Sequence, residues 1–334
     1  MTVMTGAKAS FPGPSGGPER FLVAGLGVQG RKRLAICGQE AAVTVDPHVD
    51  EADYRDIADV PLGEFDAALV CTPDAAKMEI LQYLLENGKH VLVEKPLLCD
   101  DARSYAKLED LCRRKGVVCY TAYNHRFEPH FVRMRDLIES GRLGTLYSIR
   151  LFYGNGTARL VRESRWRDSG DGVLPDLGSH LLDTILFWTG KPAEPFVMQT
   201  ARSHENAAYD HVVLGCDGEP VISLEMMLLS WRNDFHADVY GEHGSAHIRS
   251  LCKWGPSSFT HRTRKLPSGI PDEETVTLCQ PDPTWRLEHR HFIAMCTDPN
   301  AHDYGNTRND AWICDILASL AKSRVGAGSR HVAT

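Results

Sequence analysis

The stretch GDGVLPDLGSHLLD, residues 170–183, places an acid and an imidazole four positions apart, at Asp176 and His180. Side chains at this spacing share one face of a helix. Leu177, Leu181 and Leu182 would bury the neighbouring faces of that helix. A carboxylate beside an imidazole suits proton transfer, but an inert, hydrogen-bonded pair satisfies the same pattern. The choice between the two interpretations depends on the rest of the chain.

A lysine lies at the end of a second stretch of interest, HVLVEKP, residues 90–96. The apolar run predicts a strand with Lys95 at its C-terminal end, and Pro96 fixes the chain as it leaves the strand. Ligands bind at this edge of an open parallel sheet. A merely surface-exposed lysine is the alternative, but it gives no reason for the proline that follows.

The segment GLGVQG, residues 25–30, follows an apolar strand and opens a helical pattern, as a dinucleotide-binding G-x-G-x-x-G motif must. Gly25 allows the tight turn, Gly27 lets a pyrophosphate approach the backbone, and Gly30 allows close packing of helix on strand. The helix N-terminus would offer N–H groups and positive partial charge to the phosphates. A plain glycine turn is the alternative.

The next apolar run, AAVTVD, ends at Asp46, 21 positions after Gly25. An acid at this place accepts hydrogen bonds from the adenosine ribose hydroxyls. Asp50 and Glu51 add negative charge, and His48 is the one cation candidate nearby. A 2′-phosphate would be repelled, so the sequence favours NAD over NADP.

These segments need a scaffold, and the order of the elements predicts one. Strand and helix patterns alternate through residue 123, which indicates a parallel sheet covered on both faces. Thereafter alternating strands with Asp-Gly and His-Gly turns predict an antiparallel sheet. We therefore expect a flexible tail (1–19), an α/β Rossmann domain (20–123) and an α+β domain with an open-faced, mostly antiparallel sheet (124–334). The last helix (308–323) is expected to pack back on the first domain.

Composition excludes several classes of protein. The 334 residues are 43% hydrophobic and 24% charged, and the net charge is -7. The sequence shows no basic face, so we do not expect a nucleic-acid partner. No apolar run approaches the roughly 18 residues of a membrane span, and the N-terminal stretch lacks the apolar region of a secretory signal. The ten cysteines form no CxxC pair, which favours free thiols in a cytoplasmic protein over disulfides or a metal site.

GLGVQG, HVLVEKP and SGDGVLPDLGSHLLD, in this order, resemble the Gfo/Idh/MocA family, which includes glucose–fructose oxidoreductase and inositol dehydrogenases. The resemblance covers residues 20 to 323. AYNHRFEP (122–129) is similar to the family's N-x-R-F-x-P segment, and RNDAWICDILASLAKS (308–323) is similar to its last helix. The glycine motif occurs in many dehydrogenases, whereas E-K-P with D-x-x-x-H is far more specific.

The resemblance implies that hydride passes between the nicotinamide and a carbon that bears oxygen. His180 would be the general base, because an imidazole with an ordinary pKa near 6.5 suits that task. Asp176 would orient it or bind substrate, and Lys95 would stabilise the developing alkoxide or relay the proton. Substrate contacts would also include Trp166 and Arg126, although Arg126 could equally form a salt bridge. The residues expected to contact the cofactor are Gly25, Gly27, Val28, Gln29, Gly30, Asp46, Cys71, Thr72, Pro73, Glu94, Lys95 and Asn124. Glu94 would orient Lys95 or pack at the sheet edge.

Two positions depart from the family pattern. Asp171 interrupts the usual run of three glycines before the helix, and it would be strained if its backbone were left-handed. In CTPDAAK, Lys77 replaces the histidine that usually follows T-P-x-x-x. This second change bears on cofactor contact rather than on the reaction.

The predicted function is an NAD-dependent oxidoreductase that acts on a secondary hydroxyl of a sugar, cyclitol or nucleotide sugar. Three alternatives remain: a glycosidase assisted by transient oxidation, an imine reductase, and a non-catalytic NAD sensor. The stretch ISLEMMLLSWRND (222–234) predicts Leu, Met and Trp on the outer face of the second sheet, a face seldom left wet. We expect this face to form a homodimer or homotetramer, unless loop 251–272 of the same chain covers it.

Overall fold

The computed structural model describes residues 17–99, 101–165, 167–298 and 305–327. Its contacts divide these residues into two compact units. The parallel-sheet unit comprises described residues of 9–124 and 283–314, and the antiparallel-sheet unit those of 125–282 and 315–334. The predicted fold class is confirmed, since a five-stranded parallel sheet precedes a mostly antiparallel eight-stranded one. The sequence places residues 283–314 in the second domain, whereas the contacts group them with the first unit.

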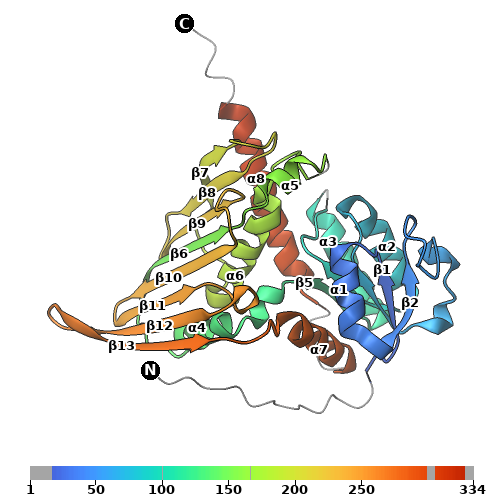
Figure 1. The fold of residues 1–334 in the computed structure, drawn as a ribbon, viewed down its shortest axis with the longest axis horizontal. Coiled ribbons are helices and arrows are strands. Elements are labelled where there is room, and N and C mark those ends of the chain that lie inside the picture. The colour runs from blue at the N-terminus through green and yellow to red at the C-terminus, as the bar shows by residue number, and fades with distance from the viewer. Residues whose placement is uncertain (1–16, 100, 166, 299–304, 328–334) are drawn as a thin grey trace, which may run out of the picture. The chain divides into compact units, whose positions relative to one another are not determined.

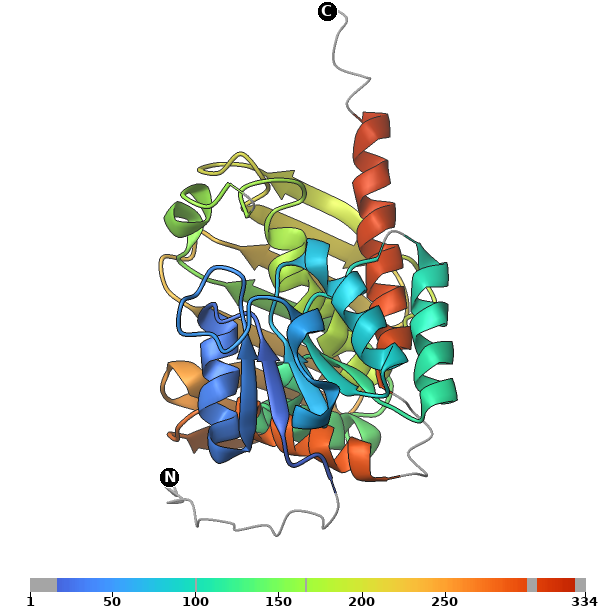
Figure 2. The same ribbon diagram turned by 90° about the vertical axis from the view of Figure 1, so that its right-hand side faces the viewer.

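The parallel-sheet unit has strand order β2-β1-β3-β4-β5, and every adjacent pair is parallel. The principal elements are β1 (Phe21–Ala24), α1 (Val28–Cys37), β2 (Ala41–Val45), β3 (Ala67–Val70), α2 (Asp74–Glu86), β4 (His90–Glu94), α3 (Ala102–Lys115), β5 (Cys119–Ala122) and α7 (Thr284–Thr297). Short 3-10 turns lie at Gly38–Glu40, Ile57–Asp59 and Leu62–Glu64. Strands β1, β3, β4 and β5 are almost wholly buried and the edge strand β2 is partly buried, because helices cover both faces of the sheet (Figure 2).

Alternation along the strands divides the core of this unit into two layers. Leu22 and Val70 face helices α2 and α3, where Leu81 and Leu108 pack against them. Phe21 and its neighbours on the other face pack against α1 and against Phe292 of α7. Helix α7 therefore completes the second layer, which explains why it groups with this unit despite its distance in the sequence.

The antiparallel-sheet unit has strand order β13-β12-β11-β10-β6-β9-β8-β7, and only the pair β6–β9 is parallel. Its strands are β6 (Leu146–Gly154), β7 (Val197–Arg202), β8 (His211–Cys216), β9 (Val221–Met227), β10 (Asp234–Gly241), β11 (Gly244–Arg249), β12 (Ser257–Lys265) and β13 (Gly269–Leu278). Its helices are η4 (Asn124–Phe127, which begins at the unit boundary), α4 (Pro129–Glu139), α5 (Ala158–Arg162), η5 (Leu174–Gly178), α6 (Ser179–Thr189) and η6 (Cys252–Trp254). The unit boundary falls within α8 (Thr307–Ala327).

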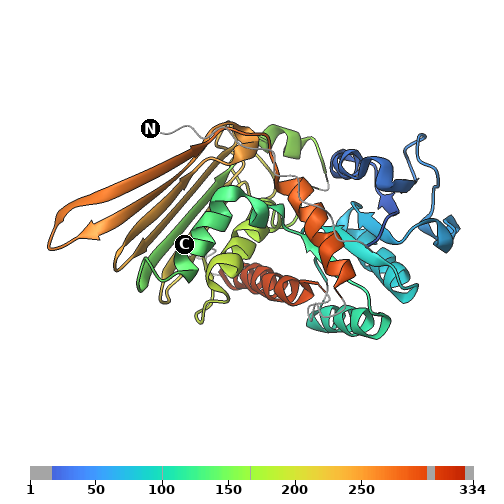
Figure 3. The same cartoon turned by 90° about the horizontal axis from the view of Figure 1, so that it is seen from below.

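Helices α4 and α6 lie along one face of this sheet (Figures 1 and 3). Phe131 of α4 contacts Trp188 of α6 and Phe235 of β10, with ring centroids 5.2 and 4.9 Å apart. The Trp188 indole donates a hydrogen bond to the Phe131 carbonyl at 3.1 Å, so its polar atom is satisfied within the core. Among the described residues of this unit, no helix covers the opposite, outer face (Figure 3).

The outer face is less apolar than the sequence predicts. Leu224 and Met226 are buried toward the helices, because the alternation of β9 leaves Ser223, Glu225 and Met227 on the outer face. Of the predicted residues, Met227 and Leu229 are partly buried, and Trp231 is 73% exposed. The alternative that loop 251–272 covers this face does not hold, because most of these residues extend the sheet beyond β11 as β12 and the start of β13.

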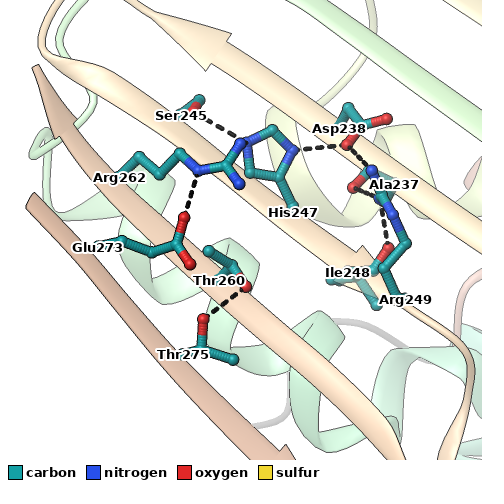
Figure 4. Close-up of polar contacts among 10 residues, drawn as sticks. All are labelled: Ala237, Asp238, Ser245, His247, Ile248, Arg249, Thr260, Arg262, Glu273 and Thr275. Atoms are coloured by element: carbon teal, nitrogen blue, oxygen red, sulfur yellow. Dashed lines mark hydrogen bonds and ion pairs between the residues drawn. The ribbon is translucent and has the colours of Figure 1, made fainter. Parts of the chain in front are cut away.

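Across β10 to β13 the outer face carries a polar network (Figure 4). Asp238 accepts hydrogen bonds from His247 at 2.5 Å and from Arg249 at 2.6 Å. Burial alone would raise the pKa of Asp238, but these two donors outweigh it and hold the pKa below its usual value. Arg262 binds Glu273 at 2.7 Å, next to His247. The outer face of this half of the sheet is therefore polar and charged.

Candidate functional site

The glycines of the GLGVQG loop occupy three different environments, each matching one requirement of a dinucleotide site. Gly25 has φ +87°, and a Cβ there would lie 2.7 Å from the Cys71 carbonyl oxygen. A Cβ on Gly30 would lie 1.7 Å from the Gly25 carbonyl oxygen, so helix α1 packs directly on the loop. A Cβ on Gly27 would have no atom within 4 Å. The loop thus leaves open space at the one glycine where a pyrophosphate would approach.

Helix α1 presents its N-terminus to this space. No side chain caps Gly27, and residues 27–29 are exposed, including Val28 at 74%. Free backbone N–H groups and the helix dipole favour an anion there. Thr72 follows the neighbouring strand β3. Its hydroxyl is buried and has no hydrogen-bond partner in the described part of the chain. The loop, the helix end and this hydroxyl together fit a bound dinucleotide.

Asp46 closes the loop from the end of β2. One carboxylate oxygen accepts from the Leu26 N–H at 2.7 Å, and the other accepts from His48 and Val49 at 2.8 and 3.1 Å. Burial would raise the pKa of Asp46, but these backbone donors outweigh it and lower the pKa. The group is therefore a fixed carboxylate, and its remaining lone pairs can accept ribose hydroxyls.

Lys95 follows β4 and precedes a cis peptide bond to Pro96. The Glu94 carboxylate, which the sequence predicts to orient Lys95 or to pack at the sheet edge, accepts from the buried Arg33 guanidinium of α1 at 2.8 Å. Arg33 also donates to Glu288 of α7 at 2.6 Å. Burial would lower the pKa of Arg33, but its two carboxylate partners raise it. Through Arg33, Glu94 of β4 is therefore linked to helices α1 and α7.

Asn124 and Arg126, which the sequence assigns to the cofactor and the substrate, have protein partners. The Asn124 amide donates to the Thr284 hydroxyl at 2.8 Å. Arg126 holds both carboxylate oxygens of Asp183 at 2.6 to 3.1 Å. Burial raises the pKa of Asp183 in spite of this ion pair. The geometry of Arg126 agrees with the salt-bridge alternative. Trp166 lies outside the described residues.

In the antiparallel-sheet unit, Asp176 and His180 do not lie on a plain α-helix. Residues Leu174–Gly178 form a π-helical turn that leads into α6. This turn is wider than an α-helical one, so the angle between positions i and i+4 differs from that of the plain helix that the sequence predicts. The Asp176 carboxylate lies 3.6 Å from the Arg167 guanidinium and is 41% exposed, while the His180 residue is 7% exposed.

The imidazole of His180 stacks on that of His125, with centroids 4.1 Å apart and planes 20° apart. Tyr153 of β6 lies 5.4 Å from the His125 ring. The Lys253 ammonium lies 3.2 Å from His125 Nε2 and 4.7 Å from the Trp254 ring centroid. Because an ammonium can only donate, Nε2 of His125 is the acceptor of this bond. We call these three residues, His180, His125 and Lys253, the imidazole stack.

Lys253 is held by the short helix η6. Burial lowers the pKa of Lys253, and the carboxylates of Asp282, Glu128 and Asp176 oppose that shift. Next to it, Cys252 donates from its backbone N–H and its thiol to the two oxygens of Glu128, at 3.2 and 2.9 Å. Burial raises the pKa of Glu128 in spite of these bonds. The ammonium is therefore fixed close to the stacked rings.

Sequence reasoning missed His125 and Lys253. His125 lies within the segment AYNHRFEP, between two residues that were singled out, and its stacking could not be inferred from spacing. Lys253 lies in a loop without any motif. Asp171 does not take the strained left-handed conformation considered from the sequence, because Gly170 and Gly172 on either side take the positive φ values, +60° and +54°.

Comparison with known proteins agrees with this arrangement. Residues 20–123 match the family described as "Oxidoreductase family, NAD-binding Rossmann fold", and residues 131–247 match "GFO/IDH/MocA C-terminal domain". The two ranges together cover more than half of the chain. No helix in the described residues is both long enough and apolar enough to cross a membrane.

Two curated relatives and one solved structure illustrate the similarity. The scyllo-inositol 2-dehydrogenase (NADP(+)) IolW of Bacillus subtilis is 29% identical over 44% of this chain and 41% of its own. The myo-inositol dehydrogenase Hyg17 of Streptomyces leeuwenhoekii is 36% identical over 38% of each chain. The chain thus spans less than half the length of these relatives. Levoglucosan dehydrogenase in complex with NADH and levoglucosan has a similar fold, with a TM-score of 0.73 and 18% identity over 91% of this chain and 97% of that one.

Proposed function

Because this chain belongs to the Gfo/Idh/MocA family of oxidoreductases, we propose that it is an NAD-dependent dehydrogenase for a secondary hydroxyl of a sugar, cyclitol or nucleotide sugar. The observation that carries the proposal is the glycine loop, in which a Cβ on Gly25 or Gly30 would clash with the backbone, whereas the space at Gly27 is open to a pyrophosphate. The related inositol dehydrogenases support the substrate class.

Gly27, the N-terminus of α1 and Thr72 would hold the dinucleotide, and the fixed carboxylate of Asp46 would accept from its ribose. NAD, when bound, supplies the nicotinamide ring that takes up or returns the hydride. A 2′-phosphate would face the carboxylate of Asp46, so we propose a preference for NAD, even though the relative IolW is named for NADP(+).

His180 would accept the proton that the substrate hydroxyl loses as hydride leaves its carbon. Stacking on His125 orients the imidazole of His180 and excludes water from one of its faces. The ammonium of Lys253 disfavours a positive charge on the stacked rings, so the base stays ready to accept a proton. Lys95 would stabilise the alkoxide that develops on the substrate oxygen.

We also propose that the outer face of the eight-stranded sheet pairs with another copy of the chain. The half formed by β6, β8 and β9 carries Phe152, Val213 and Met227 on that face, next to the charged half of Figure 4. A mixed apolar and charged surface of this kind suits a specific, self-complementary interface.

The test is the absorbance of reduced cofactor at 340 nm with NAD or NADP and a panel of inositols, aldoses, aminosugars and nucleotide sugars. We expect turnover with NAD on one polyol, and a loss of about 100-fold or more in His180→Ala and in Lys95→Ala. His236→Ala is the control for the imidazole, because His236 lies on the outer face and pairs with Asp234. No turnover on any substrate would contradict the proposal. Cleavage of a glycoside without net reduction of NAD would instead identify the redox-assisted glycosidase.

A further inference from the structure

The structure assigns to Lys77 the role of a positioning residue that fixes the turn carrying Lys95, an inference that rests on the proposed function. Lys77 lies in the first turn of α2, yet its side chain is only 3% exposed. Its ammonium donates to the carbonyl oxygens of Glu94 at 2.7 Å and of Pro96 at 2.8 Å. These two carbonyls belong to the residues immediately before and after Lys95.

The three N–H bonds of an ammonium are all used at this position. The third acceptor is the carboxylate of Asp74, one helical turn earlier, at 2.7 Å. Because every donor is occupied by the protein, Lys77 has none left for a phosphate or a ribose. It is therefore a clamp on the backbone and not a cofactor ligand, in contrast to what its place in the T-P-x-x-x segment suggests.

The backbone at Lys95 needs such a clamp. The ladder between β3 and β4 ends at the pair Val70–Val93, so the residues beyond it have no partner in strand β3. Pro96 has no N–H, which removes one of the donors that could hold the turn. On the other side, the ladder with β5 ends at the pair Glu94–Ala122, so Lys95 and Pro96 lie beyond both neighbouring strands. The ammonium of Lys77 holds the carbonyls of residues 94 and 96 at once, and this restricts the rotation that would swing the Lys95 side chain.

The chain offers a matched control. Lys89, at the opposite end of β4, also donates to two backbone carbonyls, those of Leu62 at 2.6 Å and Phe65 at 2.7 Å. Lys77→Met and Lys89→Met each remove one ammonium and leave two carbonyls without that donor. Only the first change touches the turn at Lys95.

We expect Lys77→Met to lower kcat by about 10- to 100-fold and to leave the KM for NAD within about threefold, because misplacing a catalytic group by about 1 Å costs on that order. Lys89→Met should leave both constants within about twofold. Lys77→Arg, which keeps charge and donors, should recover part of kcat. A rise in the KM for NAD with unchanged kcat would overturn the inference and make Lys77 a cofactor contact.

Two further measurements keep the inference testable. Asp74→Asn alters only a half-exposed partner and should fold even if Lys77→Met does not; we expect a fall in kcat of about threefold from it. The rate at which the Lys95 amine is acetylated in the protein without cofactor, followed by peptide mass spectrometry, reports on the position of Lys95 without requiring turnover. This rate should change at least about threefold in Lys77→Met relative to Lys89→Met. An unchanged rate overturns the clamp, whereas inactivity of the wild type on every substrate overturns the proposed function alone.

Discussion

At the scale of single residues, the imidazole stack places a positive charge, that of Lys253, close to the proposed base. Lys253 carries a buried ammonium 3.2 Å from His125, which in turn stacks on His180 at 4.1 Å. A positive charge in a poorly solvated site disfavours a second one nearby. We therefore expect the Lys253 ammonium to disfavour a proton on the proposed base, His180.

Replacing Lys253 by Met removes that charge and keeps most of the apolar stem. The imidazoles should then accept a proton at higher pH, so the acidic limb of the profile of kcat/KM against pH should move up by about half to one unit. The profile would be measured between pH 4.5 and 9. Lys253→Arg should keep the wild-type midpoint, and Lys265→Met, a surface pair with Asp272, should do the same. An unmoved midpoint in Lys253→Met would show that the ammonium does not influence the base.

At the scale of elements, the buried ion cluster of Arg33, Glu94 and Glu288 connects α1, β4 and α7. Arg33 is 1% exposed, and its guanidinium also lies 4.4 Å from the Trp285 ring centroid. Removing one member of such a cluster leaves buried charges uncompensated. The cluster therefore adds to the apolar packing of Phe292 in holding α7, distant in sequence, on the parallel-sheet unit.

Arg33→Met should lower the free energy of unfolding of that unit by about 3–5 kcal/mol, measured by chemical denaturation. The triple change Arg33→Met, Glu94→Gln, Glu288→Gln should recover part of the loss, because it leaves no unpaired charge. Arg55→Met is the control, since its pair with Asp50 is 49% and 96% exposed and should contribute little. A stability loss as small as that of the control would mean that the cluster is hydrated.

At the scale of the whole molecule, the outer face of the eight-stranded sheet bears on assembly, since no helix among the described residues of its unit covers it. Phe152 and Met227 lie on it beside the network of Asp238, His247 and Arg249. A monomer would leave these side chains in water, which is the physical reason to expect an assembly.

Sedimentation of the 37.1 kDa chain at micromolar concentration should give a mass that is two or four times this value. Met227→Arg should shift the distribution toward monomer, because it places a charge in the apolar half of the face. Ile270→Arg, at an 88% exposed position of the β12–β13 hairpin, should not. A single monomeric species of the wild-type chain would contradict the proposed assembly.

The sequence by itself determined the elements whose physics is local. The glycine loop with its strand and helix, the acid at the end of β2 and the lysine at the end of β4 could all be read from spacing, because turn geometry and strand ends follow from neighbouring residues. The same holds for the order of a parallel sheet followed by an antiparallel one. For these reasons the fold class and the cofactor loop were predictable.

Only the tertiary structure decided which side chains meet. No local pattern reports that Lys77 holds the carbonyls on either side of Lys95, that Glu94 pairs with Arg33, or that His125 stacks on His180. Likewise, no local pattern indicated the π-helical turn at Leu174–Gly178 or the pleat of β9 that turned Leu224 inward. Such contacts join residues far apart in the chain, and they depend on packing and burial that spacing alone does not encode.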